Sequence, residues 1–425
     1  MSSAKKSDKK LLVLDASYCL EAIRQRGLLE SVTCRDLDGY FVHVWTAHPF
    51  ATLVSSDHWS DRYGPPAEYK LGERHTFVEG KIGRFRVFKN FPAINFLFSQ
   101  IGVFSRLLGL IRKEKISAVR AGDPLYVGLF GWALARISGV PLVIRIGGNS
   151  DKVYETTGSP LMPRLFRTRQ REKQIERFVL ARADLVAGAN QDNLDFALAN
   201  GARPERSTLF RYGNLIDKIH FLPRSQRPGG RSLLGEFGTL EPKLLLYVGR
   251  LERVKQPDHV VRVLALLREW GQRVSLLIVG DGSLRTALVA LAENLGVSSH
   301  VVFCGNRDQQ WLAQVIPIAD VVLSPHTGRA LSEAALGAAP IVAYDVDWQG
   351  ELVRAGATGE LVPCGDWIRM AEAARRLLTD LNYARRLGDN ARTSALEMMD
   401  PQALNRHEID QYEALFARLS NSKQK

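Results

Sequence analysis

The chain has 425 residues, of which 45% are hydrophobic and 24% charged, with 35 Gly and 18 Pro. This composition excludes a fibrous, collagen-like or wholly disordered protein, and the length predicts two domains. The net charge of +12 is unevenly distributed, because residues 1–220 hold 33 basic and 22 acidic side chains, whereas residues 221–425 hold 24 and 23. The excess in the first half indicates an anionic partner for that half.

The cysteines and the uncharged stretches of the sequence indicate in which cellular compartment the protein is found. The four cysteines are scattered, which fits a reducing compartment and argues against a structural zinc site. The apolar run at 11–14 is too short for a signal peptide. The uncharged stretches 39–56 and 90–105 contain polar residues, so neither is expected to cross a bilayer. We therefore expect a cytoplasmic protein that is soluble or bound to a surface.

Short apolar runs alternate with segments of helical period along the whole chain. The strands expected in the first half are Leu11–Asp15, Tyr40–Thr46, Arg84–Phe88, Ala118–Gly122, Pro141–Gly147 and Leu185–Ala189. Those expected in the second half are Leu244–Gly249, Val274–Gly280, Val301–Gly305, Val321–Ser324 and Ile341–Tyr344. Such runs predict parallel strands buried on both faces, and thus an α/β protein with two Rossmann-like, doubly wound domains.

The domains are expected at 1–220 and 242–400, joined by a linker at 221–241 that is rich in Pro, Gly, Ser and Arg. A last helix is expected within 401–425, with Pro401 in its first turn. Ligands of open α/β sheets bind at the carboxyl ends of the strands. The functional site is therefore expected in a cleft across which the two domains face each other.

Two cations follow the first strand of the second domain. In VGRLERVK, 248–255, the strand ends at Gly249, and Arg250 and Lys255 flank the turn into the next helix. Two cations near a helix N-terminus suit a diphosphate. The alternative is a pair of solvated surface charges, which the position after a buried strand disfavours.

A glycine-containing turn, VGDG, follows the next strand. Gly280 and Gly282 would let the backbone approach a ligand closely. An ordinary strand-to-helix turn, in which Asp281 caps the helix, is at least as good an interpretation.

The strongest pattern is the strand, loop and small-residue helix of 319–345. The backbone amides of His326, Thr327 and Gly328 would point at a ligand over the start of the helix near Arg329. Glu333 lies one turn into the helix, where its carboxylate can accept hydrogen bonds from the hydroxyls of a ribose. The alternative role for Glu333 is a favourable interaction with the helix dipole.

In the first domain the segment RIGGNSD follows a strand. Gly147 and Gly148 would allow close backbone approach, and Asn149 and Asp151 offer polar groups. A purely structural Asn-Ser-Asp turn is an equally good interpretation.

Two stretches concentrate the basic charge of the first half. Residues 91–115 combine large apolar side chains at helical spacing with Arg112, Lys113 and Lys115. The stretch 161–182 adds Arg164, Arg167, Arg169, Arg171, Lys173 and Arg177. A basic, apolar helix can lie on an anionic membrane surface, although a core helix with a solvated face is slightly favoured. Nucleic acid is not expected as a partner, because no recognisable module is present.

The ordered motifs GRL-x3-K, VGDG, FCGN, ADVVLSPH…GRALSEAALGAAPIVA and ELVRAGATGELVP resemble the C-terminal domain of family 4 retaining glycosyltransferases, which have the GT-B fold. The match runs from Leu244 to Leu378, and FRYGNLID at 210–217 is similar to the segment that closes the N-terminal domain in that family. The resemblance implies that Arg250 and Lys255 hold a donor diphosphate, Glu333 the donor ribose, and Asn306 and Arg307 line the base.

Three departures from the family pattern concern the sugar and acceptor. The family has a Glu eight positions before the ribose Glu, where this chain has Pro325, so His326 or Arg329 is expected to contact the sugar instead. The Gly-Gly loop after the first strand is replaced by LDASYCL. A His after a strand of the N-terminal domain is replaced by RIGGNSD, 145–151.

The resemblance implies a retaining glycosyltransferase of hexosyltransferase type, acting in the synthesis of cell-surface polysaccharide or glycolipid. Its donor would be a nucleotide-diphosphate sugar bound by the C-terminal domain, and its acceptor a glycan or lipid-linked molecule bound by the N-terminal domain, with the last helix crossing back to that domain. No cofactor or metal is expected. The protein is expected in the cytoplasm, either soluble or peripherally bound to an anionic surface on the inner face of the membrane. Two alternatives are a catalytically silent scaffold of the same fold and a nucleotide-sugar epimerase.

Overall fold

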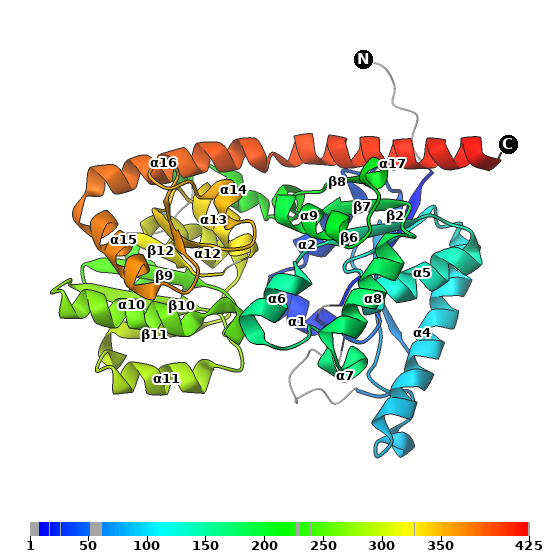
Figure 1. The fold of residues 1–425 in the computed structure, drawn as a ribbon, viewed down its shortest axis with the longest axis horizontal. Coiled ribbons are helices and arrows are strands. Elements are labelled where there is room, and N and C mark those ends of the chain that lie inside the picture. Colours follow the sequence, from blue (N-terminus) through cyan, green and yellow to red (C-terminus); the bar gives the residue numbers. More distant parts are fainter. Residues whose placement is uncertain are drawn as a thin grey trace. The chain divides into compact units, whose positions relative to one another are not determined.

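The computed structural model describes residues 8–16, 18–25, 27–51, 62–226, 230–238, 240–326 and 328–423. The chain divides into two compact units (Figure 1), the first comprising 1–215 and 401–425 and the second 216–400. The division falls five residues before the expected start of the linker. Within 221–241, Leu234 is buried in the core of the second unit, so this segment packs there rather than running free.

The first unit contains an eight-stranded sheet in the order β3-β4-β2-β1-β5-β6-β7-β8, parallel except for β3, which is antiparallel to β4. Its strands are β1 (Lys10–Leu14), β2 (His43–His48), β3 (Ala67–Lys70), β4 (His75–Glu79), β5 (Ala118–Ala121), β6 (Leu142–Ile146), β7 (Leu185–Gly188) and β8 (Ser207–Leu209). Its helices are α1 (Leu20–Gln25), α2 (Glu30–Thr33), α4 (Pro92–Glu114), α5 (Tyr126–Ser138), α6 (Ser150–Thr157), α7 (Pro163–Phe166), α8 (Arg169–Leu180), α9 (Gln191–Ala199) and α17 (Pro401–Lys423).

Alternate residues of these strands supply two separate cores. Leu12 and Leu14 of β1 face a core shared with α4, α5, α8 and α9, whereas Leu11 and Val13 face the opposite core, which includes Tyr412 and Leu415 of α17. Helix α17 therefore covers one face of the first unit's sheet, and it begins at Pro401 as expected.

The second unit contains a six-stranded, entirely parallel sheet in the order β11-β10-β9-β12-β13-β14. Its strands are β9 (Lys243–Val248), β10 (Val274–Val279), β11 (Val301–Gly305), β12 (Val321–Ser324), β13 (Ile341–Asp345) and β14 (Glu360–Pro363). Its helices are α10 (Pro257–Glu269), α11 (Arg285–Asn294), α12 (Gln309–Val315), α13 (Arg329–Leu336), α14 (Gln349–Leu352), α15 (Trp367–Thr379) and α16 (Leu381–Met398). Both faces of this sheet are buried, which confirms the α/β class with two Rossmann-like sheets.

One expected strand is wrong. Residues 84–88 form no strand and contain instead the short 3₁₀ helix η2 (Arg86–Phe88). The cause is Asn95 near the start of α4, whose Oδ1 accepts hydrogen bonds from the amides of Arg84 (2.7 Å) and Phe85 (2.9 Å) and whose Nδ2 donates to the Phe85 carbonyl (2.7 Å). These bonds satisfy the backbone groups that a strand would have offered to a neighbour.

Candidate functional site

Four adjacent strands of the second unit bring the predicted donor residues to one edge of the sheet. Gly249, Gly280 and Asn306 directly follow β9, β10 and β11. The loop from Pro325 to Gly328 follows β12, which pairs with β9. The carboxyl edge of the sheet therefore carries the donor candidates that the structure describes, as expected for a parallel sheet.

Arg250 and Lys255 lie in the turn between β9 and α10. The hydroxyl of Tyr247, which is buried, donates to the carbonyl of Arg250 over 3.1 Å and so holds the start of the turn. Arg250 is exposed, while Lys255 ends the 3₁₀ helix η8 (Arg253–Lys255) and is half-buried. Burial, followed by repulsion from Arg250, lowers the pKa of Lys255 to about 8, against the opposing attraction of Asp347.

The glycines of the VGDG turn make room for a neighbouring loop. Gly280 has φ of +134°, and a Cβ there would lie 1.9 Å from the Gly249 carbonyl oxygen. A Cβ on Gly282 would lie 2.5 Å from the carbonyl oxygen of Leu251. These glycines pack the β10–α11 turn against the β9–α10 turn, which positions Arg250.

Buried polar groups hold the loop after β12. Gln349, which is fully buried, donates through Nε2 to the carbonyl of Pro325 (3.0 Å) and accepts from the hydroxyl of Ser324 (2.7 Å). His326 is also buried, and its Nδ1 donates to the carbonyl of Val254 over 2.9 Å. The imidazole thus ties the loop after β12 to the residue beside Lys255. Gln349 was not predicted as a functional residue, because the sequence DWQGEL around it is typical of an ordinary polar turn.

Helix α13 begins at Arg329, and Gly328 at its N-cap has no side chain to hydrogen-bond the first amides. Thr327 lies outside the described residues. Glu333 is buried, with Oε1 at 3.5 Å from Nε of Arg329, so the two predicted donor residues pair along the helix. This end of α13 offers a positive dipole to the carboxyl edge of the sheet.

The two residues predicted to line the base differ in their surroundings. Asn306 is exposed. Arg307 donates through Nε to the carbonyl of Cys304 (3.1 Å) and pairs with Glu236 (3.2 Å). Its guanidinium also lies over the rings of Phe237 and Trp311, at 5.2 and 5.1 Å from their centroids. These contacts fix Arg307 within its own unit.

The predicted acceptor residues lie in the first unit, after β6. Gly147 and Gly148 are exposed. Asn149 is the N-cap of α6: its Oδ1 accepts from the amides of Asp151 and Lys152, and its Nδ2 donates to Asp192 over 3.0 Å. The side chain of Asn149 is therefore engaged in shaping the loop.

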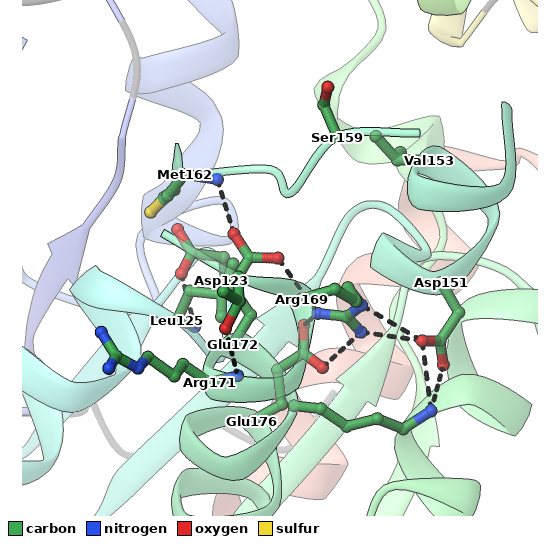
Figure 2. Close-up of polar contacts among 12 residues, drawn as sticks. Asp123, Leu125, Asp151, Val153, Ser159, Met162, Arg169, Arg171, Glu172 and Glu176 are labelled. Carbon is green, nitrogen blue, oxygen red and sulfur yellow. Dashed lines mark hydrogen bonds and ion pairs between the residues drawn. The ribbon is translucent and has the colours of Figure 1, made fainter. Parts of the chain in front are cut away.

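Asp151 belongs to a network of charges around Arg169 (Figure 2). The buried Arg169 contacts Asp151 (2.9 Å), Glu172 (3.2 Å) and Glu176 (2.6 Å), and Lys173 also pairs with Asp151. Although burial alone would raise the pKa of Asp151, the hydrogen bonds from Arg169 and Lys173 lower it. Asp151 thus fastens α6 to α8, and part of the basic stretch 161–182 is internal rather than a free surface.

Asp123 lies two residues beyond the end of β5, in the same region of the first unit (Figure 2). Its Oδ1 accepts from the amide of Leu125 over 2.7 Å. Burial, opposed by that hydrogen bond, raises the pKa of Asp123 to about 7, and the nearby charges of Asp15 and Glu176 add to the increase. Asp123 is therefore a carboxyl group that titrates near neutral pH.

Within the described ranges, no group of three or more His, Cys, Asp or Glu side chains could hold a metal ion. The carboxyl edge of the second unit instead offers cations, a helix N-terminus and a buried carboxylate. Such a set can bind a diphosphate joined to a hydroxylated ring.

Residues 237–394 match the model of the family described as glycosyl transferases group 1. D-inositol 3-phosphate glycosyltransferase of Nocardia farcinica is 34% identical over 213 residues, which cover 46% of this chain and 47% of that protein. Alpha-D-kanosaminyltransferase of Streptomyces kanamyceticus is 26% identical over 309 residues, covering 69% of this chain and 78% of that protein. With the first of these relatives, the match thus spans about half of that protein's length.

Solved structures resemble nearly the whole chain. Sucrose-phosphate synthase from Thermosynechococcus elongatus superimposes with a TM-score of 0.75 at 18% identity, covering 96% of this chain and 100% of that one. Anabaena HepE in complex with UDP superimposes with a TM-score of 0.69 at 17% identity, covering 95% and 100%. These likenesses confirm the fold expected from the sequence.

Proposed function

We propose that this chain, whose residues 237–394 match the glycosyl transferases group 1 and whose fold is GT-B, transfers a hexose from a nucleotide-diphosphate donor to a glycan or lipid-linked acceptor. The anomeric configuration of the sugar is retained. The second unit binds the donor and the first unit the acceptor. UDP in the complex of the structurally similar HepE supports a nucleoside diphosphate as part of the donor.

The observation that carries this proposal is the pair Arg250 and Lys255. The lowered pKa of Lys255 means that burial and the neighbouring Arg250 disfavour its protonated, charged form. A bound diphosphate would stabilise that form, because its anionic groups then face the two cations. A pair of merely solvated surface charges would not perturb the pKa of Lys255 in this way.

The same pair supplies the catalytic effect. When the bond between the sugar C1 and the diphosphate oxygen breaks, negative charge develops on that oxygen. The oxygen of the acceptor hydroxyl forms the new bond to C1, and its proton passes to the leaving diphosphate. Arg250, Lys255 and the amides at the start of α13 stabilise the developing charge without reorganising. No metal is needed in this scheme, so activity is expected to survive chelation by EDTA.

His326 and Glu333 have supporting roles. The Nδ1–H of His326 is committed to Val254, so the imidazole holds the loop after β12 against the turn that carries Lys255. Its Nε2 lies 3.5 Å from Oδ2 of Asp347, so contact of His326 with the sugar requires that this pair opens when the donor binds. Glu333, buried beside Arg329, accepts hydrogen bonds from the ribose hydroxyls of the donor. Gly328 leaves the first amides of α13 accessible to phosphate oxygens.

A double variant tests the assignment. Arg250→Ala/Lys255→Ala should lower transfer, or hydrolysis of the donor in the absence of acceptor, by about 100-fold or more. The control is Arg253→Ala, which removes an exposed cation from the same turn and should leave the rate unchanged. Equal rates in the double variant and the parent would refute the enzyme assignment and favour a silent scaffold. Both curated relatives above are named as transferases, which disfavours that scaffold and an epimerase.

We further propose that the first unit rests on an anionic membrane surface at the cytoplasmic side, where a lipid-linked acceptor for polysaccharide or glycolipid synthesis would be held. Among the described residues, eight of the 18 exposed large apolar side chains lie between 85 and 101. This apolar patch consists of Phe85, Val87, Phe88, Phe91, Ile94, Leu97, Phe98 and Ile101. Exposed Arg86 and Lys89 lie within the patch, a combination that suits anionic lipid headgroups.

Helix α4 is long and apolar enough to span a membrane, but part of it is buried in the first unit, which favours a position on the membrane surface. Of the window that meets those criteria, 33% is buried in the chain. Val103, Leu107 and Ile111 in the second half of α4 belong to the core of the first unit. Crossing a bilayer would remove these side chains from that core, whereas insertion of the first half alone leaves the core intact.

Vesicle sedimentation tests the surface proposal. Binding to vesicles with anionic lipid at low salt should be weakened about tenfold by Phe91→Ser/Leu97→Ser. The matched control is Ile368→Ser/Leu381→Ser, which changes two exposed apolar residues of the second unit. No association of the parent with anionic vesicles at low salt would refute the proposal.

A further inference from the structure

Three arginines of the first unit surround a cavity of about 190 Å³. Arg120 lies on β5 and Arg145 on β6, and Arg35 comes from the 3₁₀ helix η1 (Cys34–Asp36). Asp15, directly after β1, also lines the cavity, with Tyr212 from the 3₁₀ helix η4 (Tyr212–Leu215). The cavity lies at the carboxyl ends of three adjacent strands, where open α/β sheets bind ligands.

The three guanidinium groups are mostly buried, and those of Arg35 and Arg145 are only partly satisfied. Arg120 is 3% exposed and Arg145 8%. Arg35 donates to Asp15 over 3.1 Å and Arg145 to the carbonyl of Phe210 over 2.8 Å. Within the described part of the chain, Nη1 of Arg35 and Nε of Arg145 are buried and have no hydrogen-bond acceptor. A buried donor without an acceptor is costly, most of all on a charged group.

The charge around the cavity does not balance. Among the residues that the structure describes, the carboxylates paired with these arginines are Asp15, with Arg35, and Glu408 of α17, with Arg120 over 2.6 Å. Arg145 bonds to carbonyl oxygens and lies 5.8 Å from the centroid of the Tyr212 ring. Burial lowers the pKa of Arg145, and repulsion from Arg120 lowers it further, against the attraction of Glu408. One positive charge in excess is thus buried beside an open volume.

We propose that this cavity binds an oxyanion, a phosphate or carboxylate group, between Arg35, Arg120 and Arg145. Such a group accepts hydrogen bonds from Nη1 of Arg35 and Nε of Arg145 and neutralises the excess charge. The fork geometry of arginine suits both kinds of group. An anionic group of the acceptor is the natural occupant under the proposed function, but the binding site itself does not depend on that function.

Phosphate binding is measured in a background that lacks the donor cations. In Arg250→Ala/Lys255→Ala, inorganic phosphate is titrated by calorimetry at constant ionic strength against chloride. Arg145→Gln added to this background should weaken phosphate binding at least about tenfold. The added control Arg112→Gln, on the exposed face of α4, should leave it unchanged.

A second variant acts in the opposite direction, so that a folding defect cannot imitate the result. Asp15→Asn removes a competing carboxylate and frees Arg35, and it should tighten phosphate binding several-fold. A parallel titration with glycerol 3-phosphate distinguishes a phosphate ester from free phosphate as the occupant. If both compounds bind, the cavity accepts an organic phosphate ester. If only inorganic phosphate binds, the cavity accepts the free ion. Absence of phosphate binding in the background protein, or equal affinity in the Arg145 and Asp15 variants, would overturn the proposal, whether or not the chain transfers sugar.

Discussion

Arg120 on β5 and Glu408 on α17 form a buried ion pair, with Nη1 2.6 Å from Oε1, although 288 positions separate them in the sequence. Both side chains are almost fully buried, at 4% and 2% exposed. The pair fastens the last helix of the chain to the sheet of the first unit.

Glu408→Ala should therefore lower the free energy of unfolding of the first unit by about 3 kcal/mol, because the variant leaves Arg120 buried without its carboxylate. The control is Asp410→Ala on the exposed side of α17, which should change it by less than about 0.5 kcal/mol. Urea unfolding followed by circular dichroism measures both. Equal midpoints in the two variants would contradict a structural role for the pair.

Lys255 predicts a pH dependence for donor binding. The protonated amine binds diphosphate, and a bound anion raises its pKa, so affinity for UDP should fall as the pH rises through about 8. Calorimetric titrations between about pH 7 and about pH 9.5 measure this dependence. Lys255→Met should bind UDP weakly with a flat profile over the same range, and a flat profile in the parent would refute the assignment.

Asp123 predicts a pH dependence for stability. The pKa of Asp123 is raised in the folded chain to about 7, so the folded state prefers the protonated carboxyl. Its contribution to stability is complete below about pH 4 and is lost as the pH rises through about 7. Asp123→Asn should therefore be more stable than the parent at pH 8 and about equal to it at pH 4, whereas the exposed control Asp195→Asn should show no such difference. Unfolding midpoints at the two pH values provide the test.

Alanine substitutions of two glycines at the carboxyl edge of the second unit's sheet should have different effects on stability. Gly280→Ala places a Cβ 1.9 Å from the Gly249 carbonyl at a φ of +134°, so it should cost about 2 kcal/mol or more and weaken UDP binding by displacing the Arg250 turn. Gly328→Ala has no heavy atom within 4 Å of the added Cβ and an ordinary φ of −86°. It should leave stability nearly unchanged. A larger loss of stability in Gly328→Ala than in Gly280→Ala would contradict these roles of the two glycines.

The sequence predicts much of the second unit because its motifs are local. Arg250 and Lys255 follow a long apolar strand at a fixed spacing, and Glu333 lies at the start of a helix of small residues, so short segments carry the information. The same holds for the strands themselves, since runs such as 244–249 are buried on both faces. Gln349 could not be predicted, because its role depends on contacts with Ser324 and Pro325 of another loop.

The first unit is less predictable because its distinctive features depend on distant residues. An arginine inside an apolar strand, as at 120 or 145, has no interpretation until α17 is known to cover that face of the sheet with Glu408. The alternating run 84–88 resembles a strand, and only the side chain of Asn95 turns it into a loop. The three-residue strand β8 is too short to show a period.

The most direct test of the account is equilibrium binding of UDP, GDP, ADP and NAD to the full chain and to Arg250→Ala/Lys255→Ala. We predict that one nucleoside diphosphate binds more tightly than NAD and that the double variant weakens this binding about 100-fold or more, since two charged contacts are lost. Tighter binding of NAD, or equal affinity of the parent and the double variant for every nucleoside diphosphate, would contradict it.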